Sequence, residues 1–598
     1  MCGINLVLNH PEKGEEAIQK MMNASRHRGP DHSAWLKAAP GIYVAGSRLK
    51  ILDLGEAGNQ PVTTEDGKAV LVWNGALYNY QDLRNELLGK GVVFGSRSDS
   101  EVLIHWLKLF GEEGVKQLQG MFAFAFVDKE KGKVIVGRDP YGKKPLYFNH
   151  QNDQWLFSSE ARAIVLSGVV MKRMDVSQYV PYFYSRHTFP DLSFFKGIGQ
   201  VMPGTVMAFD FTGHHYVSIS LEINREQVDL PSVTDFREMI LDAVLKHFHA
   251  DVPVGMILSG GADSSLLLHS WHQETGIPLN TFTAAFDPKY QGKYSDPKFA
   301  SALAANYHCI HHKVWVTPEI VFENWGEYIS SLDQPIGDSA SFLTWLIAKE
   351  AKKHVKVLVS GAGADELFSG YDRHMAFRYY LKNPSLFRSL AKWILLSPLL
   401  PRRIKKILNA ITDSAEGTYL NFSSLQSIPF DIRNDFLAYY PKDTSPYKAA
   451  LSWDREYFLV NDVLKIHDNA TMAHGLEGRA PFMDESLVAL SNSLSEEQHI
   501  LLEPKQWIKM ILKEDGLEEI ASRKKLGFGL PLKEWFETDQ IFRERIFLAI
   551  QTFEVASGTD FPEDMRKLAR HPEEHIQDSF LQIWNLFILA SWKVKQGL

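Results

Sequence analysis

The chain has 598 residues, of which 45% are hydrophobic and 23% charged, and its formal net charge is -8 at pH 7. This length exceeds a single hydrophobic core and predicts more than one domain. The slight acidic excess argues against nucleic acid as a partner, because phosphate contacts need clustered Lys and Arg. No run of about 18 apolar residues and no N-terminal targeting segment is present, so we expect no membrane association. The two cysteines, Cys2 and Cys309, are typical of a reducing, cytoplasmic setting.

In the first part of the chain, apolar runs separated by turn residues are typical of strands, and several are too apolar to have a wet face. Such runs occur at 42–46, 69–73, 121–127 and 133–137. Helical periodicity interrupts them at 80–88 and 100–109. The pattern predicts layered sheets with helices outside.

A polar, turn-rich stretch from Phe211 to Ser232 follows these strands. Clusters of turn-forming residues between patterned segments are typical of linkers. We therefore expect a first domain over residues 1–212, a linker over 213–233 and a second domain over 234–598.

The second domain alternates strands with helices. An amphipathic helix at 234–249 precedes an apolar run at 254–258, and further runs at 279–286 and 356–360 are each followed by a turn and a helical pattern. Alternation of this kind predicts a doubly wound parallel sheet, and hence an α/β fold. Beyond about residue 383 the sequence is mostly helical.

Cys2 is a candidate nucleophile because of its place in the chain. The small thiol residue after Met1 permits removal of the initiator, which leaves a thiol and a free α-amino group on one residue. The amine can then act as the base that activates the sulfur. Their reference pKa values, about 8.5 and about 8, allow easy proton exchange near neutral pH. Alone, however, a cysteine at position two is usually an ordinary cysteine.

The segments that accompany Cys2 are weak signals one by one. In chain order they are His27-Arg28-Gly29-Pro30-Asp31, Ser47-Arg48-Leu49, Asn74-Gly75-Ala76-Leu77-Tyr78-Asn79, Ser98-Asp99, Gln119-Gly120-Met121-Phe122-Ala123-Phe124 and Gly137-Arg138-Asp139-Pro140-Tyr141-Gly142. As an ordered set they are specific. With Cys2, they resemble the glutaminase domain of class II (N-terminal-nucleophile) glutamine amidotransferases over residues 2 to about 210.

This resemblance implies a role for each matching residue. Attack by Cys2 on the glutamine amide makes an oxyanion, for which Asn74 and the Gly75 N–H match the stabilising donors. Arg48 matches the guanidinium that grips the α-carboxylate of glutamine. Asp99 matches the carboxylate that binds the α-amino group of glutamine.

In the second domain, Ser259-Gly260-Gly261-Ala262-Asp263-Ser264-Ser265 joins a strand to a helix. Glycines let the backbone approach an anion, and the helix N-terminus adds positive potential. The spacing differs from the GxxxxGK[ST] loop of phosphoryl transfer. It resembles the loop of enzymes that split ATP into AMP and pyrophosphate. The residues assigned to ATP or pyrophosphate on this resemblance are Leu258, Ser259, Gly260, Gly261, Asp263, Ser264, Ser265, Ala284, Gly361 and Lys525.

A second loop, Ser360-Gly361-Ala362-Gly363-Ala364-Asp365-Glu366, also follows a strand. Asp263 and Asp365 are candidate ligands of Mg²⁺, which takes one or two carboxylates beside phosphate oxygens and water. The later segments 468–484 and 523–529 complete the pattern. Together they resemble the synthetase domain of the asparagine synthetase family over about 235–545, in which Lys525 matches a lysine that stabilises charge on ATP and the acyl-adenylate.

Both resemblances in this order are those of glutamine-hydrolysing asparagine synthetases. They imply an Ntn-hydrolase αββα sandwich followed by an ATP-pyrophosphatase (adenine nucleotide alpha hydrolase-like) domain with added helices. The implied reaction adenylates the side-chain carboxylate of aspartate with MgATP, and ammonia released at Cys2 travels through a tunnel and displaces AMP. The implied ligands are glutamine, aspartate or another carboxylate, ATP and Mg²⁺. A homodimer is compatible with the resemblance, but the sequence does not fix the oligomeric state.

Two positions depart from the common family pattern. Many relatives have Glu where this chain has Ala76, which removes one contact to the glutamine amine. Many asparagine synthetases also have Glu where it has Ala362, and that Glu is a candidate base for the incoming ammonia; Glu366, Arg373 or His374 are the substitutes considered. The Ala362 departure leaves open amide transfer to a sugar acid, a peptide or a natural-product precursor. An intramolecular lactam or lasso-peptide cyclase is disfavoured by the intact Cys2 motif, as is a non-enzymatic glutamine sensor.

Overall fold

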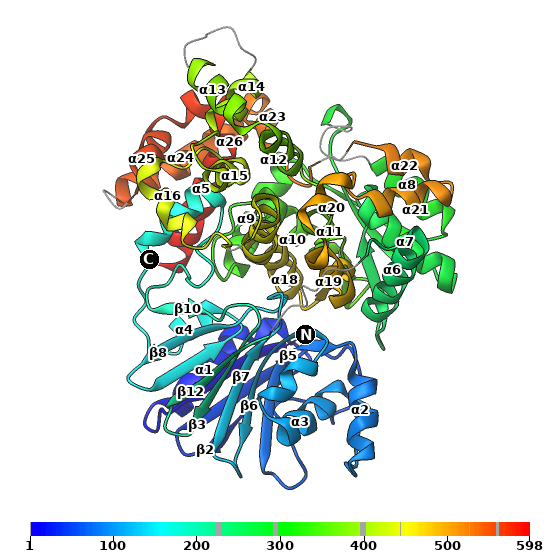
Figure 1. Ribbon diagram of the computed structural model, residues 1–598. Helices are drawn as coiled ribbons and strands as arrows, with labels where there is room; N and C mark the ends of the chain where they lie inside the picture. Colours follow the sequence, from blue (N-terminus) through cyan, green and yellow to red (C-terminus); the bar gives the residue numbers. More distant parts are fainter. Residues whose placement is uncertain are drawn as a thin grey trace.

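The computed structural model describes residues 2–221, 229–290, 297–394, 402–442, 444–524, 527–557 and 561–597. Within these ranges the chain forms two antiparallel sheets and one parallel sheet (Figure 1). The first antiparallel sheet has, in order, β10 (Ile198–Gln200), β8 (Tyr147–Gln151), β9 (Gln154–Ser158), β1 (Cys2–Leu8), β3 (Ile42–Arg48) and β2 (His32–Ala39). The second has β12 (His215–Ser220), β11 (Thr205–Asp210), β7 (Lys133–Arg138), β6 (Gly120–Asp128), β5 (Ala69–Leu77) and β4 (Val62–Thr63).

The alternation of side chains along β6 builds the layers. Phe122, Phe124 and Phe126 pack with the helices on one face of the sheet. Ala123 and Ala125 face the opposite way, into the core between the two sheets, because successive side chains of a strand point to opposite faces. Large rings thus fill the space under the helices, while small side chains let the sheets approach. The expectation of strands too apolar for a wet face is confirmed, since every residue of β6 is buried.

Helices cover both outer faces of the paired sheets. The helices of this part are α1 (Gly14–Ser25), α2 (Tyr80–Gly89), α3 (Asp99–Phe110), α4 (Ala161–Leu166) and α5 (Tyr179–Ser185). Residues of α2 and α3 pack on the second sheet, and residues of α1 and α4 pack on the first. The resulting order of helix, sheet, sheet and helix is the expected αββα sandwich.

One segment differs from the sequence expectation. Strand β12 lies inside residues 213–233, which we expected to be a linker, and it pairs with β11 at the edge of the second sheet. Its side chains alternate between polar and apolar residues, as in Val217, Ser218 and Ile219. An edge strand with one wet face carries few apolar residues, so its composition resembles that of a linker. Residues 222–228 of the same stretch lie outside the described ranges.

The parallel sheet contains, in order, β15 (Ile310–Trp315), β14 (Asn280–Ala285), β13 (Val254–Ile257), β16 (Val357–Val359) and β17 (Glu477–Arg479). All of its pairings are parallel. Side chains from its two faces join two different helix-covered cores, with Met256 and Leu258 in one and Phe282 and Ala284 in the other. The doubly wound parallel sheet expected from the alternating pattern is therefore confirmed.

Helices make up most of the remaining described chain. Around the sheet lie α6 (Val233–Phe248), α7 (Ala262–Thr275), α8 (Pro297–Asn306), α9 (Pro318–Ser331), α10 (Ser339–Ala351), α11 (Ala364–Leu367) and α12 (Asp372–Lys382). Next come α13 (Pro384–Ile394), α14 (Arg402–Asn409), α15 (Ala415–Ser423), α16 (Phe430–Leu437), α17 (Pro446–Trp453), the π-helix η5 (Asp454–Leu464), α18 (Lys465–Met472), α19 (Glu485–Ser493) and α20 (Glu496–Leu501). The last are α21 (Gln506–Glu514), α22 (Glu518–Ser522), α23 (Leu532–Thr538), α24 (Gln540–Ser557), α25 (Glu563–Arg570) and α26 (Ile576–Gln596). None of the helices in the described ranges has the length and apolar character that crossing a membrane requires.

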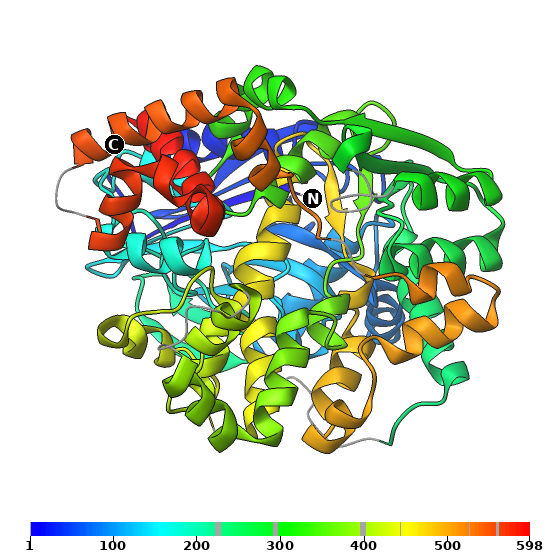
Figure 2. The same ribbon diagram turned by 90° about the horizontal axis from the view of Figure 1, so that it is seen from above.

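The first part of the chain is interlocked with the last helices. Helix α5 lies away from the two sheets and among the helices at the C-terminal end (Figure 1), and the view from above shows those helices over the strands of the first part (Figure 2). Tyr179 of α5 stacks on Phe561 with ring centroids 4.3 Å apart, and the Tyr182 hydroxyl donates to the carbonyl of Asn585 at 3.0 Å. The two parts therefore share a core.

Replacing Trp592 with Ala tests this shared core. Trp592 of α26 is fully buried between Phe194 and Phe195 of the first part. We expect Trp592→Ala to lower the free energy of unfolding by about 3–5 kcal/mol, as for other buried aromatic truncations, measured by denaturant unfolding. Val594→Ala on the same helix is the control, because Val594 is 76% exposed; an equal loss in both variants would contradict the shared core.

Candidate functional site

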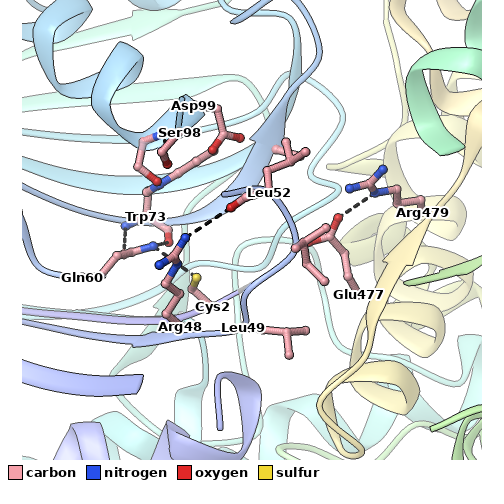
Figure 3. Close-up of a pocket in the computed structure, with 14 residues that line it drawn as sticks. Cys2, Arg48, Leu49, Leu52, Gln60, Trp73, Ser98, Asp99, Glu477 and Arg479 are labelled. Atoms are coloured by element: carbon pink, nitrogen blue, oxygen red, sulfur yellow. Dashed lines mark hydrogen bonds and ion pairs between the residues drawn. The ribbon is translucent and has the colours of Figure 1, made fainter. Parts of the chain in front are cut away.

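Cys2 begins β1, in the middle of the first sheet, and pairs in register with Arg48 of β3. Its side chain is 6% exposed and lines a pocket. The pocket brings together Cys2, Arg48, Gly75 and Asp99 (Figure 3). Of the residues assigned to glutamine from the sequence, Arg48 and Asp99 thus line one cavity with Cys2.

Asn74 holds the nucleophile candidate from the neighbouring sheet. The backbone N–H of Cys2 donates to Asn74 Oδ1 at 2.9 Å. Asn74 is fully buried, and its Nδ2 has no hydrogen-bond partner among the described residues. A buried, unpaired N–H donor on a side chain that contacts the Cys2 backbone is suited to a developing oxyanion. Gly75 follows in the same strand, and a Cβ there would lie 2.0 Å from the carbonyl oxygen of Met121, so β5 and β6 approach too closely for any side chain.

Arg48 is engaged by the loop that follows it. Its Nη1 donates to the carbonyl of Gly55 at 2.7 Å and to Asn59 Oδ1 at 3.1 Å, and its Nη2 donates to the carbonyls of Leu52 and Asp53. The guanidinium has five N–H donors, so these bonds leave Nε for another ligand. Bidentate binding of a substrate carboxylate at Arg48 therefore requires exchange of one or more of these loop contacts.

Burial shifts the pKa values of Cys2 and Asp99 in the pocket. Burial raises the pKa of the Cys2 thiol, although the Arg48 guanidinium acts against this shift. Burial also raises the pKa of Asp99 to about 6, because desolvation disfavours the charged form of an acid. Asp99 is 6% exposed and its carboxylate accepts from the Leu77 N–H. An ammonium group bound beside Asp99 would favour its ionised form and lower its pKa toward the usual value of an aspartate.

Two residues of the pocket come from the second part of the chain. Glu477 and Arg479 of β17 line it together with Cys2 (Figure 3). Arg479 Nε donates to Glu477 Oε1 at 2.6 Å, and its Nη1 donates to the carbonyls of His247 and His249. Both belong to the motif segment 468–484, but sequence reasoning gave them no role, because no local signal shows that β17 faces the first domain.

A buried ion cluster joins the two parts beside this pocket. Arg28 Nη2 pairs with Asp468 Oδ2 at 2.8 Å, and Lys144 Nζ lies 3.5 Å from the other oxygen of Asp468. Arg28 also lies 3.6 Å from Glu160, and its Nε donates to the carbonyl of Cys2. Burial opposes the charge of Asp468, but Arg28 and Lys144 hold its pKa below the usual range. The carboxylate is therefore ionised at neutral pH and bonded across the interface.

The glycine-rich loop follows β13, as expected. Gly260 has φ 73°, a conformation that favours glycine, and Gly261 caps α7. Ser264 Oγ accepts from the Ser259 N–H at 3.2 Å, so the two serines close the loop on itself. Arg523 Nη1 donates to the carbonyl of Gly260 at 2.7 Å and brings a positive charge that the sequence assignment did not include.

The candidate Mg²⁺ ligands Asp263 and Asp365 converge on one cation. Lys505 Nζ lies 2.6 Å from Asp263 Oδ2 and 2.6 Å from Asp365 Oδ1. Burial opposes the charge of Lys505, but the two carboxylates raise its pKa. Two converging carboxylates fit the oxygen donors that Mg²⁺ takes. Sequence reasoning missed Lys505, since a lysine after a proline carries no signal of its own.

The remaining assigned residues surround this pair. Gly361 lies next to Asp263, because a Cβ on Gly361 would be 3.3 Å from Asp263 Cβ. Ala284 belongs to β14, the neighbour of β13. Ala362 is partly buried against the core around Met256 and Leu258. Lys525 lies outside the described residues.

A second charged cluster lies on the other side of α11. Its members, hereafter the acceptor-side cluster, are Arg186, Asp338, Asp462, Arg373 and Glu366. Arg186 pairs with Asp338 and lies 3.8 Å from Asp462 Oδ2. The guanidinium carbons of Arg186 and Arg373 lie 6.0 Å and 4.5 Å from the centre of one ring, that of Phe458. Burial and the nearby Asp338 raise the pKa of Asp462 to about 8.

Two buried atoms of this cluster lack partners among the described residues. Asp462 is 1% exposed and its Oδ1 has no hydrogen-bond partner, and neither has Nη2 of Arg373. Arg373 Nε and His374 Nε2 both contact Asp454 Oδ2, at 2.8 Å and 2.6 Å. Unsatisfied buried polar atoms are costly without a ligand. Of the three substitutes considered for the missing Glu, Glu366 and Arg373 belong to the cluster, whereas His374 is held by Asp454.

A further cavity lies between the two parts of the chain. Tyr78, Met121, Lys143 and Lys144 line it from the first part, and His247, Leu464, His467, Asp468, Gly478 and Ala480 line it from the second. Burial lowers the pKa of His247 to about 3 and that of His467 to about 4. Both imidazoles are therefore neutral at pH 7.

Comparison with known proteins agrees with this geometry. A family model described as a glutamine amidotransferase domain matches residues 1–217, and one described as asparagine synthase matches residues 235–594. Fold, pocket and matches define a glutamine amidotransferase joined to an ATP-using ligase. The chain belongs to the asparagine synthase family and is an enzyme of the glutamine-hydrolysing asparagine synthase type.

Relatives match along nearly the whole chain. An asparagine synthetase [glutamine-hydrolyzing] 1 from Bacillus subtilis is 29% identical over 630 residues, which cover 99% of this chain and 96% of the relative. A putative asparagine synthetase [glutamine-hydrolyzing] from Mycobacterium tuberculosis is 28% identical, with 99% and 97% covered. An amidase, chry2, from Gibberella zeae is 26% identical and covers 90% of both chains.

Asp468→Asn tests the buried ion cluster. The substitution keeps the shape of the side chain but leaves Arg28 and Lys144 without their shared negative charge. We expect a loss of about 3–5 kcal/mol in the free energy of unfolding, because an uncompensated buried charge remains. Glu130→Gln is the control, since its pair with Lys68 is exposed and should not shift the denaturant midpoint measurably. Equal midpoints for all three proteins would contradict the role of the cluster.

Proposed function

We propose that this enzyme forms asparagine from aspartate, with glutamine as nitrogen donor and MgATP as activating substrate, and releases glutamate, AMP and pyrophosphate. The observation that carries the proposal is the shared wall of the Cys2 pocket, where Glu477 and Arg479 extend from β17. The same β17 pairs with β16, and β16 leads into the loop that contains Asp365. The donor site and the loops expected to bind ATP are therefore parts of one interlocked unit.

In the proposed first step, Cys2 attacks the side-chain amide of glutamine after loss of Met1. The thiol proton passes to the α-amino group, and a carbon–sulfur bond forms while the carbonyl electrons move to oxygen. Asn74 Nδ2 and the Gly75 N–H stabilise this oxyanion. The ammonium group then returns a proton to the leaving nitrogen, ammonia departs, and water hydrolyses the thioester to glutamate. Arg48 and Asp99 hold the substrate's α-carboxylate and α-amino group.

In the proposed second half-reaction, the carboxylate of the acceptor attacks the α-phosphorus of ATP and pyrophosphate leaves. The loop from Leu258 to Ser265 and the backbone of Gly361 would cradle the phosphates, with Ala284 beside the nucleotide and Lys525 near the developing charge. Mg²⁺ would be held by Asp263 and Asp365 and would neutralise phosphate charge. Lys505 Nζ contacts both carboxylates, so Mg²⁺ would bind there only when this ammonium group moves away from them.

Ammonia has to reach the adenylate as a neutral molecule, since ammonium is not nucleophilic. The cavity between the two parts of the chain contains two imidazoles that are neutral at pH 7, because burial lowers their pKa values. A neutral histidine does not protonate ammonia, which favours passage of ammonia through this cavity. Lys143, Lys144 and Asp468 also line the cavity, so its lining as a whole is not uncharged.

The acceptor-side cluster supports an amino acid as the acceptor. Asp365 and Glu366 are neighbours in α11, yet Asp365 faces Lys505, whereas Glu366 contacts the Tyr371 hydroxyl at 2.5 Å. An acceptor whose carboxylate reaches the ATP loops therefore lies beside the cluster. Asp462 and Asp338 favour an ammonium group there, and the unpaired Nη2 of Arg373 favours a second carboxylate. Aspartate carries both groups, whereas a sugar acid, the alternative that Ala362 raises, has no ammonium.

Cys2→Ala tests the division of labour. The variant should lose glutamine-dependent synthesis entirely and keep ammonia-dependent synthesis, because the ATP loops and acceptor-side cluster do not include Cys2. Product formation with glutamine and with ammonium chloride as nitrogen source is the measurement. Loss of both activities in a folded variant, or retention of both, would contradict the proposal.

Acceptor specificity is tested by AMP release with aspartate, succinate and gluconate as acceptors. Succinate is aspartate without the ammonium group, so we expect its kcat/KM to be at least about 100-fold lower, as for other sites that lose a buried polar partner. Asp462→Asn should reduce the ratio of the aspartate kcat/KM to the succinate kcat/KM, because the KM of aspartate rises. Glutaminase activity should not change. A gluconate or succinate value equal to that of aspartate would refute the aspartate assignment and leave the adenylating activity intact.

A further inference from the structure

Gln60 contacts the sulfur of Cys2 directly. It lies in the chain between β3 and β4 and is 2% exposed. Its Nε2 donates to Cys2 Sγ at 3.1 Å (Figure 3). The roles that the family resemblance assigns to the glutaminase site do not include this residue.

The backbone of Trp73 fixes which end of the Gln60 amide faces the sulfur. Gln60 Oε1 accepts from the Trp73 N–H at 2.7 Å, and Gln60 Nε2 donates to the Trp73 carbonyl at 2.8 Å. In a reversed amide, the Gln60 NH₂ group would face the Trp73 N–H and the Gln60 carbonyl oxygen would face the Trp73 carbonyl oxygen, so neither hydrogen bond could form. The second N–H of Nε2 is consequently directed at Sγ.

Gln60 packs between the two sheets and contacts a strand of each. On β3, a Cβ at Gly46 would lie 2.6 Å from Gln60 Cβ, so glycine is needed for Gln60 to lie against this strand. On β5, Trp73 precedes Asn74, which accepts from the Cys2 N–H at 2.9 Å. Cys2 is thus held at its nitrogen by Asn74 and at its sulfur by Gln60, both anchored on one strand.

We propose that Gln60 is a catalytic residue of the glutaminase site, whose N–H stabilises the Cys2 thiolate. The inference rests on the proposed nucleophilic role of Cys2. The thiolate exists twice in each cycle: when the thiol proton has moved to the α-amino group, and when water has attacked the thioester and the carbon–sulfur bond breaks with its electron pair left on sulfur. A hydrogen bond to sulfur favours both states, because an ionised acceptor binds an N–H more strongly than a neutral one.

The electrostatics of the pocket explain why such a donor is needed. Burial works against the thiolate, and Asp99 and Glu477 add negative charge to the same pocket. Of the two guanidinium groups, Arg48 is engaged by loop carbonyls and Arg479 by Glu477. Gln60 supplies a fixed, uncharged donor at the sulfur itself.

The test uses the pH dependence of Cys2 alkylation by iodoacetamide, a neutral reagent. The chain has two cysteines, so a Cys309→Ser background makes Cys2 the single thiol in the full-length, methionine-processed enzyme. Gln60→Met removes the donor at similar volume, and Gln60→Glu also adds a negative charge. We expect each Gln60 variant to raise the pKa of the Cys2 thiol by about one to two units. At a pH below the thiol pKa of the parent enzyme, alkylation of the variant should then be about 10- to 100-fold slower. The kcat of the glutaminase reaction should fall in parallel.

Two further variants separate this effect from general damage. Gly46→Ala should displace Gln60 and shift the alkylation profile in the same direction. Gln178→Met is the matched control, because Gln178 is also fully buried but bonds the Phe189 N–H; its profile should equal that of the parent. Ammonia-dependent AMP release should persist in every variant and so reports folding of the second part.

Unchanged alkylation profiles in both Gln60 variants would overturn the proposal, whether or not glutaminase activity falls. A shift of the same size in Gln178→Met would also overturn it. Failure of the underlying function has a different signature. If Cys2→Ala kept glutaminase activity, Cys2 would not be the nucleophile, whatever the Gln60 variants show.

Discussion

The arrangement of the molecule depends on the buried charge of Arg28. This guanidinium is fully buried and donates to the carbonyl of Cys2. It needs a carboxylate because an unpaired buried charge is prohibitive. Its partner Asp468 is 440 residues away in sequence and is shared with Lys144. The ion cluster can form only when both parts of the chain are folded and docked, so the Cys2 backbone is tied to the second part from the outset.

Several features follow from this docking. It brings β17 against the first domain, so that Glu477 and Arg479 close the Cys2 pocket, and it forms the mixed cavity around His247 and His467. In a second contact, the first part contributes a residue to the second: Arg186 pairs with Asp338 and lies near Asp462. Each site is therefore completed by a residue from the other part, which is a physical basis for coupling ammonia release to acceptor activation.

Sequence patterns predicted the layers of this fold well, because its strands are buried on both faces. The run of β6 alternates rings and small side chains, a local signal of two packed faces. Strand β12 was mistaken for a linker, since an edge strand with one wet face carries little apolar signal. Motif order singled out Cys2, Arg48 and Asp99, which line one pocket, and Asn74, which accepts from the Cys2 N–H. Lys505, Asp462 and Gln60 could not be predicted, because their roles arise from contacts made only after the chain has folded.

If the two sites are joined in one enclosed unit at this interface, ammonia passes between them without release to solvent. Synthesis from amide-¹⁵N-labelled glutamine, aspartate and MgATP in the presence of unlabelled ammonium, with mass spectrometry of the amide product, measures this transfer. We expect the product amide to retain ¹⁵N far above the isotope ratio of free ammonium in solution. An amide whose ¹⁵N fraction equals that of the dissolved pool would show that the ammonia equilibrates with solvent and would contradict an enclosed path.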